Sequence, residues 1–330
     1  MLLLTACGGG GSTNSTSRSN TTLTNGGSNN TATSPAGKIT EFPVTSAKNL
    51  QAITAGPDGN LWFTDIDGNQ IGRITPSGTV TTFALPTPGS RPGEITVGPD
   101  HNLWFTETKG DRIGRITPSG TITEFPITTS GGYLGGITTG PDGNLWFTDV
   151  LDDRIGRITP SGTITEFPEN GGNPTGITTG PDGNLWFTEN RGGQIGRITP
   201  TGTVTYFSVP VVAVDSSPVE ITRGPDGNLW FTDNGTNKIG RITPSGTITE
   251  FAIPTSAALL DGITAGPDGN LWFIEQSENK IGRITPSGIT TEFTLPTPNS
   301  SPAEIITGPN HNLWFTESGV SKIGQMTAGK

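Results

Sequence analysis

The chain is poor in cysteine, histidine and basic residues. Its 330 residues include one cysteine, Cys7, and two histidines, His101 and His311. A single cysteine excludes a disulfide within the chain. There are 19 lysines and arginines against 29 aspartates and glutamates, a formal net charge of −10, and no basic cluster is present. This composition argues against binding nucleic acid or an anionic membrane through a basic face.

Long apolar runs and helical periodicity are also absent. No segment is long and apolar enough to cross a bilayer, and only 30% of the residues are apolar, which is low for a globular protein. The sequence contains no Ser/His/Asp triad, Cys/His nucleophile or zinc-ligand spacing. Nearly every glycine belongs to a turn, a repeated strand position or a linker, so glycine-rich stretches do not indicate a phosphate loop.

A unit that occurs seven times organises most of the sequence. Each unit contains a Leu-Trp-Phe triplet, and the triplets lie 40 to 44 residues apart. Around each triplet, runs of Ile, Thr, Trp and Phe are bounded by Gly, Pro, Asn or Asp, which is typical of short strands joined by turns. Four such runs per unit predict an all-β, seven-bladed β-propeller. The seven tryptophans are Trp62, Trp104, Trp146, Trp186, Trp230, Trp272 and Trp314.

The two ends of the repeat region are expected to join. Residues 38–42 (Lys-Ile-Thr-Glu-Phe) match the fourth strand of a unit, whereas the chain ends on the third strand, at residues 323–327. The N-terminal strand should therefore complete the last blade, which would pair two open sheet edges.

Within a blade, the expected hairpin register places Trp62 opposite Arg73. An arginine over a tryptophan face would add about 0.5–2 kcal/mol as a cation–π contact. The first six units share this pair, and the seventh has Gln325 instead. Gly72, before the arginine, would leave room for a neighbouring Phe ring.

The first 37 residues depart from the repeat. Residues 3–8 (Leu-Leu-Thr-Ala-Cys-Gly) resemble a bacterial lipobox, in which the cysteine becomes the acylated first residue. Six residues precede Cys7, too few for a complete signal peptide, so we expect the true start to lie upstream. Residues 8–37 are rich in Gly, Ser, Thr and Asn and are predicted to be a disordered linker. We therefore predict a truncated lipoprotein signal (1–7), this linker and a propeller (38–330), lipid-anchored at the bacterial cell envelope or outside the cell; the alternative is a chance Ala-Cys pair.

The repeated Leu-Trp-Phe-Thr-Glu and Ile-Gly-Arg-Ile-Thr-Pro-x-Gly units resemble those of the virginiamycin B lyase (streptogramin lyase) family over residues 38–329. The resemblance implies a seven-bladed propeller. It also implies an enzyme in which a magnesium ion and histidines on one face open the ester ring of the antibiotic by elimination rather than hydrolysis.

The histidines of that family follow a proline at the entry to a blade's innermost strand, in Pro-His-x-Ile-Thr. At the seven matching positions this chain carries Gln51, Gly93, Gly135, Thr175, Val219, Asp261 and Ala303. In the last blade Ser301 also replaces the family's Glu. Elimination requires a general base, and neither Val219 nor Ala303 can remove a proton. Lyase activity would thus require a rearranged site.

His101 and His311 occur elsewhere, in place of glycine in the Pro-Asp-Gly-Asn turn. We expect that turn at the opposite end of the blade from the lyase site. Histidine tolerates the left-handed conformation better than most residues, so turn substitution is favoured over a metal-binding or catalytic role.

One set of carboxylates follows the seven tryptophans by three residues: Asp65, Glu107, Asp149, Glu189, Asp233, Glu275 and Glu317. In the family resembled, a Glu at the end of this strand in the last blade helps to hold the metal, and Glu317 is the nearest match. Because all seven units keep the acid, the alternative is a structural role such as accepting turn N–H groups.

A second set breaks the symmetry of the repeat. Glu94, Glu220 and Glu304 replace Gly or Ala before the Ile of the first strand in blades 2, 5 and 7. Carboxylates that converge near the axis would suit a hard cation such as Ca²⁺ or Mg²⁺. The alternative is three solvated glutamates at the rim of a wide opening.

Three further residues are candidate ligand contacts. Arg223 replaces a small residue in the innermost strand of blade 5 and would balance Glu220 or meet an anionic group. Tyr133 lies in a Gly-Gly-Tyr-Leu loop, and Asp261 occupies one of the histidine positions. The apolar run at residues 209–214 is a further candidate surface.

These features predict an envelope-anchored propeller that binds a small molecule or an envelope or extracellular protein, or serves as a scaffold, with Mg²⁺ or Ca²⁺ as the candidate cofactor. We expect a monomer that binds no nucleic acid. The first alternative is a magnesium-dependent streptogramin B lyase-like enzyme with a rearranged site built from Glu94, Glu220, Glu304 or Glu317. The second is a purely structural surface protein.

Overall fold

The computed structural model describes residues 36–128, 131–210 and 216–329. The chain divides into two units, residues 1–33 and 34–330. The predicted lipobox with Cys7, the linker up to residue 35 and most of the apolar run at 209–214 lie outside the described residues. Within the described residues, no helix is long and apolar enough to span a membrane.

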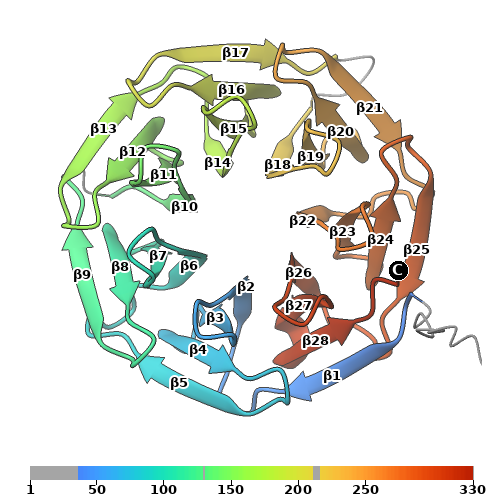
Figure 1. The fold of residues 1–330 in the computed structure, drawn as a ribbon, viewed down its shortest axis with the longest axis horizontal. Coiled ribbons are helices and arrows are strands. Elements are labelled where there is room, and N and C mark those ends of the chain that lie inside the picture. Colours follow the sequence, from blue (N-terminus) through green and yellow to red (C-terminus); the bar gives the residue numbers. More distant parts are fainter. Residues whose placement is uncertain (1–35, 129–130, 211–215, 330) are drawn as a thin grey trace, which may run out of the picture. The chain divides into compact units, whose positions relative to one another are not determined.

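The second unit is a ring of seven four-stranded antiparallel sheets, which confirms the predicted propeller (Figure 1). Blade 1 contains β2 (Leu50–Ala55), β3 (Leu61–Asp65), β4 (Gln70–Ile74) and β5 (Val80–Ala84). Blade 2 contains β6 (Pro92–Val97), β7 (Leu103–Glu107), β8 (Arg112–Ile116) and β9 (Ile122–Pro126). Blade 3 contains β10 (Leu134–Thr139), β11 (Leu145–Asp149), β12 (Arg154–Ile158) and β13 (Ile164–Pro168). Blade 4 contains β14 (Pro174–Thr179), β15 (Leu185–Glu189), β16 (Gln194–Ile198) and β17 (Val204–Ser208). Blade 5 contains β18 (Pro218–Arg223), β19 (Leu229–Asp233), β20 (Lys238–Ile242) and β21 (Ile248–Ala252). Blade 6 contains β22 (Leu260–Ala265), β23 (Leu271–Glu275), β24 (Lys280–Ile284) and β25 (Thr290–Thr294). Blade 7 contains β26 (Pro302–Thr307), β27 (Leu313–Glu317), the 3-10 turn η1 (Ser318–Val320), β28 (Lys322–Met326) and β1 (Ile39–Pro43).

The ring closes as predicted. Strand β1 pairs antiparallel with β28, with Ile39 opposite Met326 and Pro43 opposite Lys322. In Figure 1 the blue N-terminal strand completes the red C-terminal blade. Sheet pairing between strands from the two ends therefore holds the ring together.

The apolar core lies between the blades. Each of the seven buried clusters joins the Trp of one blade to the Phe of the next Leu-Trp-Phe triplet; for example, Trp62 shares a cluster with Phe105 and Trp314 shares one with Phe63. All seven Trp side chains are fully buried. Since each cluster needs two blades, no blade can bury its aromatic residues alone.

The predicted Trp–Arg pairing is confirmed. Trp62 lies opposite Arg73, whose Cζ is 5.5 Å from the Trp62 ring centroid and 5.8 Å from that of Phe83. The guanidinium also donates to the carbonyl of Pro118 in blade 2 at 3.1 Å. A Cβ on Gly72 would lie 2.0 Å from Phe63 Cζ, so this position requires glycine. One arginine thus stabilises its own blade and the contact with the next.

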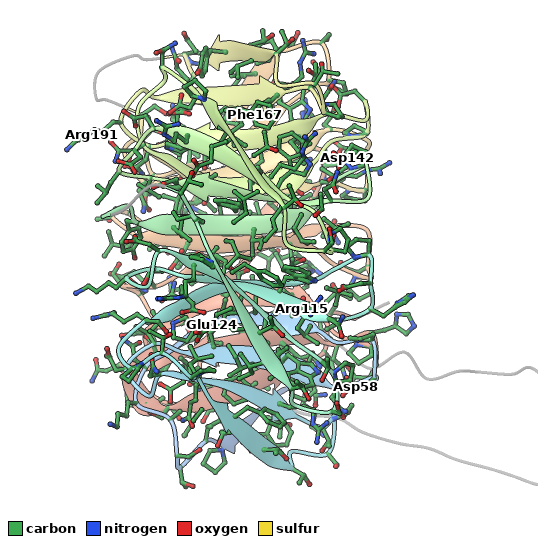
Figure 2. All side chains as sticks on the ribbon, turned by 90° about the vertical axis from the view of Figure 1, so that its left-hand side faces the viewer. Asp58, Arg115, Glu124, Asp142, Phe167 and Arg191 are labelled. Atoms are coloured by element: carbon green, nitrogen blue, oxygen red, sulfur yellow. The ribbon has the colours of Figure 1, made fainter. Side chains whose placement is uncertain are left out.

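The two faces of the ring carry different segments. Antiparallel pairing of β2 and β3 places Leu50 opposite Asp65, so the innermost strands start on the face where the second strands end. This face, which also carries the inter-blade loops, is called the loop face, and the face with the Pro-Asp-Gly-Asn turns is called the turn face. Figure 2 shows Arg191 on the loop face, and Asp58 and Asp142 on the turn face.

Both histidines lie on the turn face. His101 and His311 are exposed and adopt the left-handed conformation, with φ of 58° and 57°. The structure thus gives them the turn geometry expected from the sequence, at the far end of the blade from the starts of the innermost strands.

Candidate functional site

A cavity of about 200 Å³ lies at the loop face, where the innermost strands begin. We call it the axial mouth. Blades 1 to 6 all contribute to its wall, each through the first residues of its innermost strand or the loops beside them. The repeat therefore builds the frame, and the residues in which the blades differ determine what the cavity can bind.

Threonines of the Leu-Trp-Phe-Thr segment position these strand starts. Thr106 Oγ1 accepts the N–H of Glu94 at 3.0 Å and donates to the carbonyl of Gly135 in the next blade at 3.0 Å. Thr316 does the same between Glu304 and Gln51, at 3.1 and 2.7 Å. The register of the innermost strand shifts at these residues in every blade, for example between Pro92 and Ile95. A hydroxyl thus replaces the regular ladder bond and links neighbouring blades around the mouth.

Part of the wall of the axial mouth consists of apolar or small residues. Tyr133, Leu134 and Val150 of blade 3 contribute to it, with Tyr133 46% exposed. Gly136 is required there, because a Cβ would lie 2.9 Å from the carbonyl oxygen of Thr175. The Tyr133 ring and the two aliphatic side chains give a flat or aliphatic group an apolar surface to contact.

Acidic side chains line the same cavity. Glu94, Glu220 and Asp261 line the axial mouth. Burial raises the pKa of Glu94 to about 7. Burial, with added repulsion from Glu94, raises the pKa of Asp261 to about 7. The three side chains come from blades 2, 5 and 6, so only the closed ring brings them together.

Glu220 and Glu304 are more strongly perturbed. Burial, and then repulsion from Glu94 and Asp261, raises the pKa of Glu220 well above its usual range. Burial, followed by repulsion from Glu94, Glu220 and Asp261, does the same for Glu304, although Glu304 does not line the cavity. Close acidic neighbours disfavour simultaneous ionisation, so the four carboxyls keep their protons to a higher pH than isolated carboxyl groups do.

Glycines in neighbouring blades make room for two of these glutamates. A Cβ on Gly176 would lie 2.8 Å from Glu220 Oε2, and one on Gly262 would lie 2.9 Å from the Cα of Glu304. Glycine at positions 176 and 262 is therefore required for the packing of Glu220 and Glu304.

The remaining candidates lie elsewhere. Arg223 is exposed at the end of β18 away from Pro218, does not line the cavity, and forms no ion pair with any described residue. Glu317 is fully buried at the end of β27, and burial first, then repulsion from Glu41, raises its pKa to about 7. The cavity residues not predicted from the sequence are Ile66, Thr108, Gly136 and Val150. Ile66, Thr108 and Val150 each follow the end of a second strand, and Gly136 lies within β10.

The carboxylates after the tryptophans divide into two kinds. Asp65 accepts the N–H groups of Lys48, Asn49 and Gly68, and Asp233 accepts that of Ser217, as predicted for a structural role. In contrast, no backbone N–H of a described residue donates to the buried carboxyl oxygens of the four glutamates: Glu107, Glu189, Glu275 and Glu317. The longer side chain carries the carboxyl past the loop N–H groups.

The described residues do not fit the expected metal ion, Mg²⁺ or Ca²⁺. Among the described residues, no group of three or more His, Cys, Asp or Glu side chains is arranged to hold a metal. The axial carboxyls supply suitable oxygen ligands but not the arrangement of a metal centre.

A family model described as the virginiamycin B lyase family matches residues 20–168 and 135–330. The chain belongs to this family. The crystal structure of the selenomethionine-substituted virginiamycin B lyase from Staphylococcus aureus is similar to it, with 41% identity and a TM-score of 0.84 over 88% of this chain and 99% of that chain. A catalytically inactive histidine-to-alanine variant of the Staphylococcus aureus lyase, crystallised with quinupristin, is 42% identical with a TM-score of 0.83 over the same shares.

Among curated relatives, the virginiamycin B lyases of Bordetella parapertussis and Bordetella bronchiseptica are each 44% identical over 59 residues. That stretch covers 18% of this chain and 20% of each relative. The matched segment thus spans about a fifth of these relatives. The family and the fold of this virginiamycin B lyase family member are established, and its activity depends on the residues of its own site.

Proposed function

We propose that this chain is a ligand-binding member of the virginiamycin B lyase family, whose axial mouth holds a small molecule with a positively charged amine beside an apolar group. The observation that carries the proposal is that acidic and apolar side chains line the same cavity. Glu94, Glu220 and Asp261 face it from one set of blades, and Tyr133 and Leu134 from another.

An organic cation suits both the acidic and the apolar residues of the cavity wall. An ammonium group would relieve the repulsion that raises the pKa of Asp261 and Glu220, and it is attracted to the face of an aromatic ring such as Tyr133. An anion would add charge to an already crowded acidic site, and a neutral apolar ligand would leave the carboxyls unpaired.

The absence of imidazole at the axial mouth supports binding without lyase chemistry. The positions where the family's histidines occur carry Val219 and Ala303, and His101 and His311 lie on the turn face. The Staphylococcus aureus relative with one histidine replaced by alanine is described as catalytically inactive.

Isothermal titration calorimetry tests the binding proposal with benzyltrimethylammonium as the probe. Because bound positive charge lowers the pKa of Glu94 and Asp261, binding at pH 7 should release protons, so the measured heat should change between buffers of different ionisation enthalpy. The neutral isostere neopentylbenzene should bind at least tenfold more weakly. Equal affinity for the two probes, or no heat from either, would contradict the proposal.

Variants locate the site. Glu94→Gln should weaken binding and reduce proton release, whereas Glu278→Gln, the same change at an exposed position, should leave both unchanged.

Titration of Mg²⁺ and Ca²⁺ in a thermal-shift assay forms a separate arm, because any ligand of the folded state raises its melting temperature. Stabilisation at millimolar metal, with no response to the ammonium probe, would replace the organic cation with a metal ion.

A rearranged lyase is the second candidate, favoured by one observation. A carboxyl with a pKa of about 7, as at Glu94 and Asp261, is suited to general-base catalysis near neutral pH. Incubation with quinupristin and Mg²⁺, with the Staphylococcus aureus enzyme as positive control, distinguishes the two functions. Elimination opens the ring without a change in mass, whereas hydrolysis adds one water. Ring opening that is lost in Glu94→Gln would establish the enzyme; unchanged quinupristin supports the binding module.

The lipobox-like segment supports a location at the cell envelope, where the module would meet extracellular small molecules or a protein partner. In the full-length protein, Cys7→Ser should abolish labelling by a fatty-acid analogue and release the protein from membranes. Retained membrane association would contradict the anchor. The monomer expected from the sequence can be measured by sedimentation equilibrium.

A further inference from the structure

Blade 4 contains a pair of buried carboxyl groups away from the axial mouth. Glu169 lies in the loop between β13 and β14, and Glu189 ends β15; their exposed fractions are 4% and 0%. Neither lines the mouth cavity. We call them the blade 4 carboxyl pair.

The two side chains lie against the same residue of the loop, Gly171. Its N–H donates to Glu169 Oε2 at 2.5 Å, and a Cβ on it would lie 2.6 Å from Glu189 Cδ. Two buried carboxyls this close disfavour simultaneous ionisation. Tyr206 Oη donates to Glu169 Oε2 at 2.8 Å and accepts the N–H of Asn170 at 2.9 Å. No N–H or O–H group among the described residues donates to the oxygens of Glu189.

This arrangement is particular to blade 4. In blades 2, 6 and 7 a basic side chain on the third strand lowers the pKa of the corresponding glutamate: Arg112 for Glu107, Lys280 for Glu275 and Lys322 for Glu317. Blade 4 has Gln194 at that position, opposite Glu189. Burial, and then repulsion from Glu169 and Asp153, raises the pKa of Glu189 to about 9, against about 7 in the other three blades.

Among the described residues, no basic side chain lowers the pKa of Glu189, although Arg154 begins β12 opposite Pro168. Asp153 approaches from the turn between β11 and β12, and Tyr206 from β17, where the pair raises the pKa of the phenol. Arg191, in the turn after Glu189, is exposed, and Figure 2 shows it pointing away from the ring. A second negative charge at Glu189 would therefore remain unpaired and buried, which is costly.

The loop that carries Glu169 leads to the axial mouth. It continues into β14, whose Thr175 lines the cavity. The loop packs closely on the pair, since a Cβ on Gly171 would lie 2.6 Å from Glu189 Cδ. Hydrogen bonds also hold the loop: the N–H groups of Asn190 and Arg191 donate to the carbonyls of Asn173 and Gly172 at 3.1 and 3.2 Å, and the N–H of Asn173 donates to Asp153 Oδ1 at 2.8 Å.

We propose that the blade 4 carboxyl pair shares one proton and acts as a pH-sensitive contact that holds the loop at residues 169–173 closed, and that loss of this proton at alkaline pH opens the loop next to the axial mouth. A contact that depends on one retained proton weakens at most tenfold per pH unit above the pH at which the proton is lost. The inference does not depend on the identity of any ligand.

Hydrogen exchange of the whole protein measures the effect. Protection of the amides at residues 170–173, corrected for the intrinsic pH dependence of exchange, should be constant from pH 6 to 8 and fall up to tenfold per unit above about pH 9. In Glu189→Gln, whose amide can donate to Glu169 at any pH, protection should stay constant to pH 10. Glu107→Gln, the matched change in blade 2, should keep the wild-type profile.

A second variant separates proton sharing from packing. Tyr206→Phe removes the donor that stabilises a charged Glu169, so the midpoint of the loss should move to higher pH; a purely structural role would lower protection equally at every pH. An infrared difference spectrum between wild type and Glu189→Gln at pH 8 should show a protonated carboxyl band. Absence of that band, or a wild-type exchange profile in Glu189→Gln, would overturn the inference.

Discussion

The side chains of Glu41 and Lys322, 281 residues apart in sequence, meet at 2.7 Å across the pairing of β1 with β28. Glu41 also accepts the N–H and the hydroxyl of Thr297 in the loop from blade 6. Burial opposes ionisation of Glu41, but the hydrogen bonds from Lys322 and Thr297 lower its pKa. The N-terminal strand is thus fixed by a charged contact as well as by sheet pairing.

Removal of this contact should loosen the ring at its closure. We expect Glu41→Ala to lower the free energy of unfolding by about 1–3 kcal/mol, because it leaves Lys322 and Thr297 without their acceptor. Deletion of residues 38–43 should cost far more and expose the edge of β28. Thermal and urea unfolding measure both effects, with exposed Glu278→Ala as the control. An unchanged melting temperature after the deletion would refute closure by β1.

The arginines between blades should contribute more than surface charges do. Arg115 Cζ lies 5.4 Å from the ring centroids of both Trp104 and Phe125, and Nη1 donates to the Pro160 carbonyl at 3.1 Å. We expect Arg115→Gln to cost about 2 kcal/mol, as the sum of a cation–π contact and a hydrogen bond. Lys109→Gln, at an exposed site in the same blade, should cost less than about 0.5 kcal/mol. Equal effects in urea unfolding would contradict this assignment.

The packing of Glu304 on Gly262 gives a prediction that combines stability and binding. Gly262→Ala should push Glu304 away from the cluster, since the new Cβ would lie 2.9 Å from the Glu304 Cα. We expect a loss of about 1–3 kcal/mol in stability from overpacking, and weaker binding of benzyltrimethylammonium. Ala52 occupies the equivalent position in blade 1, so Ala52→Gly is the reverse control and should leave binding intact. Unchanged stability and affinity in Gly262→Ala would show that the glycine is not required.

The raised carboxyl pKa values predict a protein that is more stable in weak acid. Glu94 and Asp261 have pKa values of about 7 in the folded state, against about 4 in an unfolded chain. Between these limits the folded state binds more protons, so the free energy of unfolding falls as pH rises towards 7 and levels off above it for these two groups.

Each group contributes at most about 1.4 kcal/mol per pH unit, and less where water reaches it. Urea unfolding of wild type and Glu94→Gln at pH 5, 6, 7 and 8 should show a shallower decline in the variant. The exposed variant Glu278→Gln should match wild type. A wild-type protein that becomes more stable from pH 5 to 7 would contradict the protonation of these groups.

Much of the fold could be predicted because the turns within each repeat set the register in which its strands pair. The turn between Asp58 and Trp62 fixes the hairpin, and the hairpin fixes the pairing of Trp62 with Arg73. The site was less predictable. Glu94, Glu220 and Glu304 were recognised because they break the repeat, whereas Ile66 and Val150 look like any residue after a strand.

The alternation of apolar residues and turns in seven similar units was by itself enough to determine the sheets, their pairing and the closure by the first strand, because these depend on contacts within a unit or between identical units. Which side chains from different blades meet depends on the tertiary structure of the closed ring. Asp261 and Glu94 belong to different blades, yet each affects the protonation of the axial cluster. Glu189 became a proton-sharing group because a loop from blade 3 placed Glu169 beside it. Such electrostatic coupling depends on distance in space, which the order of residues along the chain does not specify.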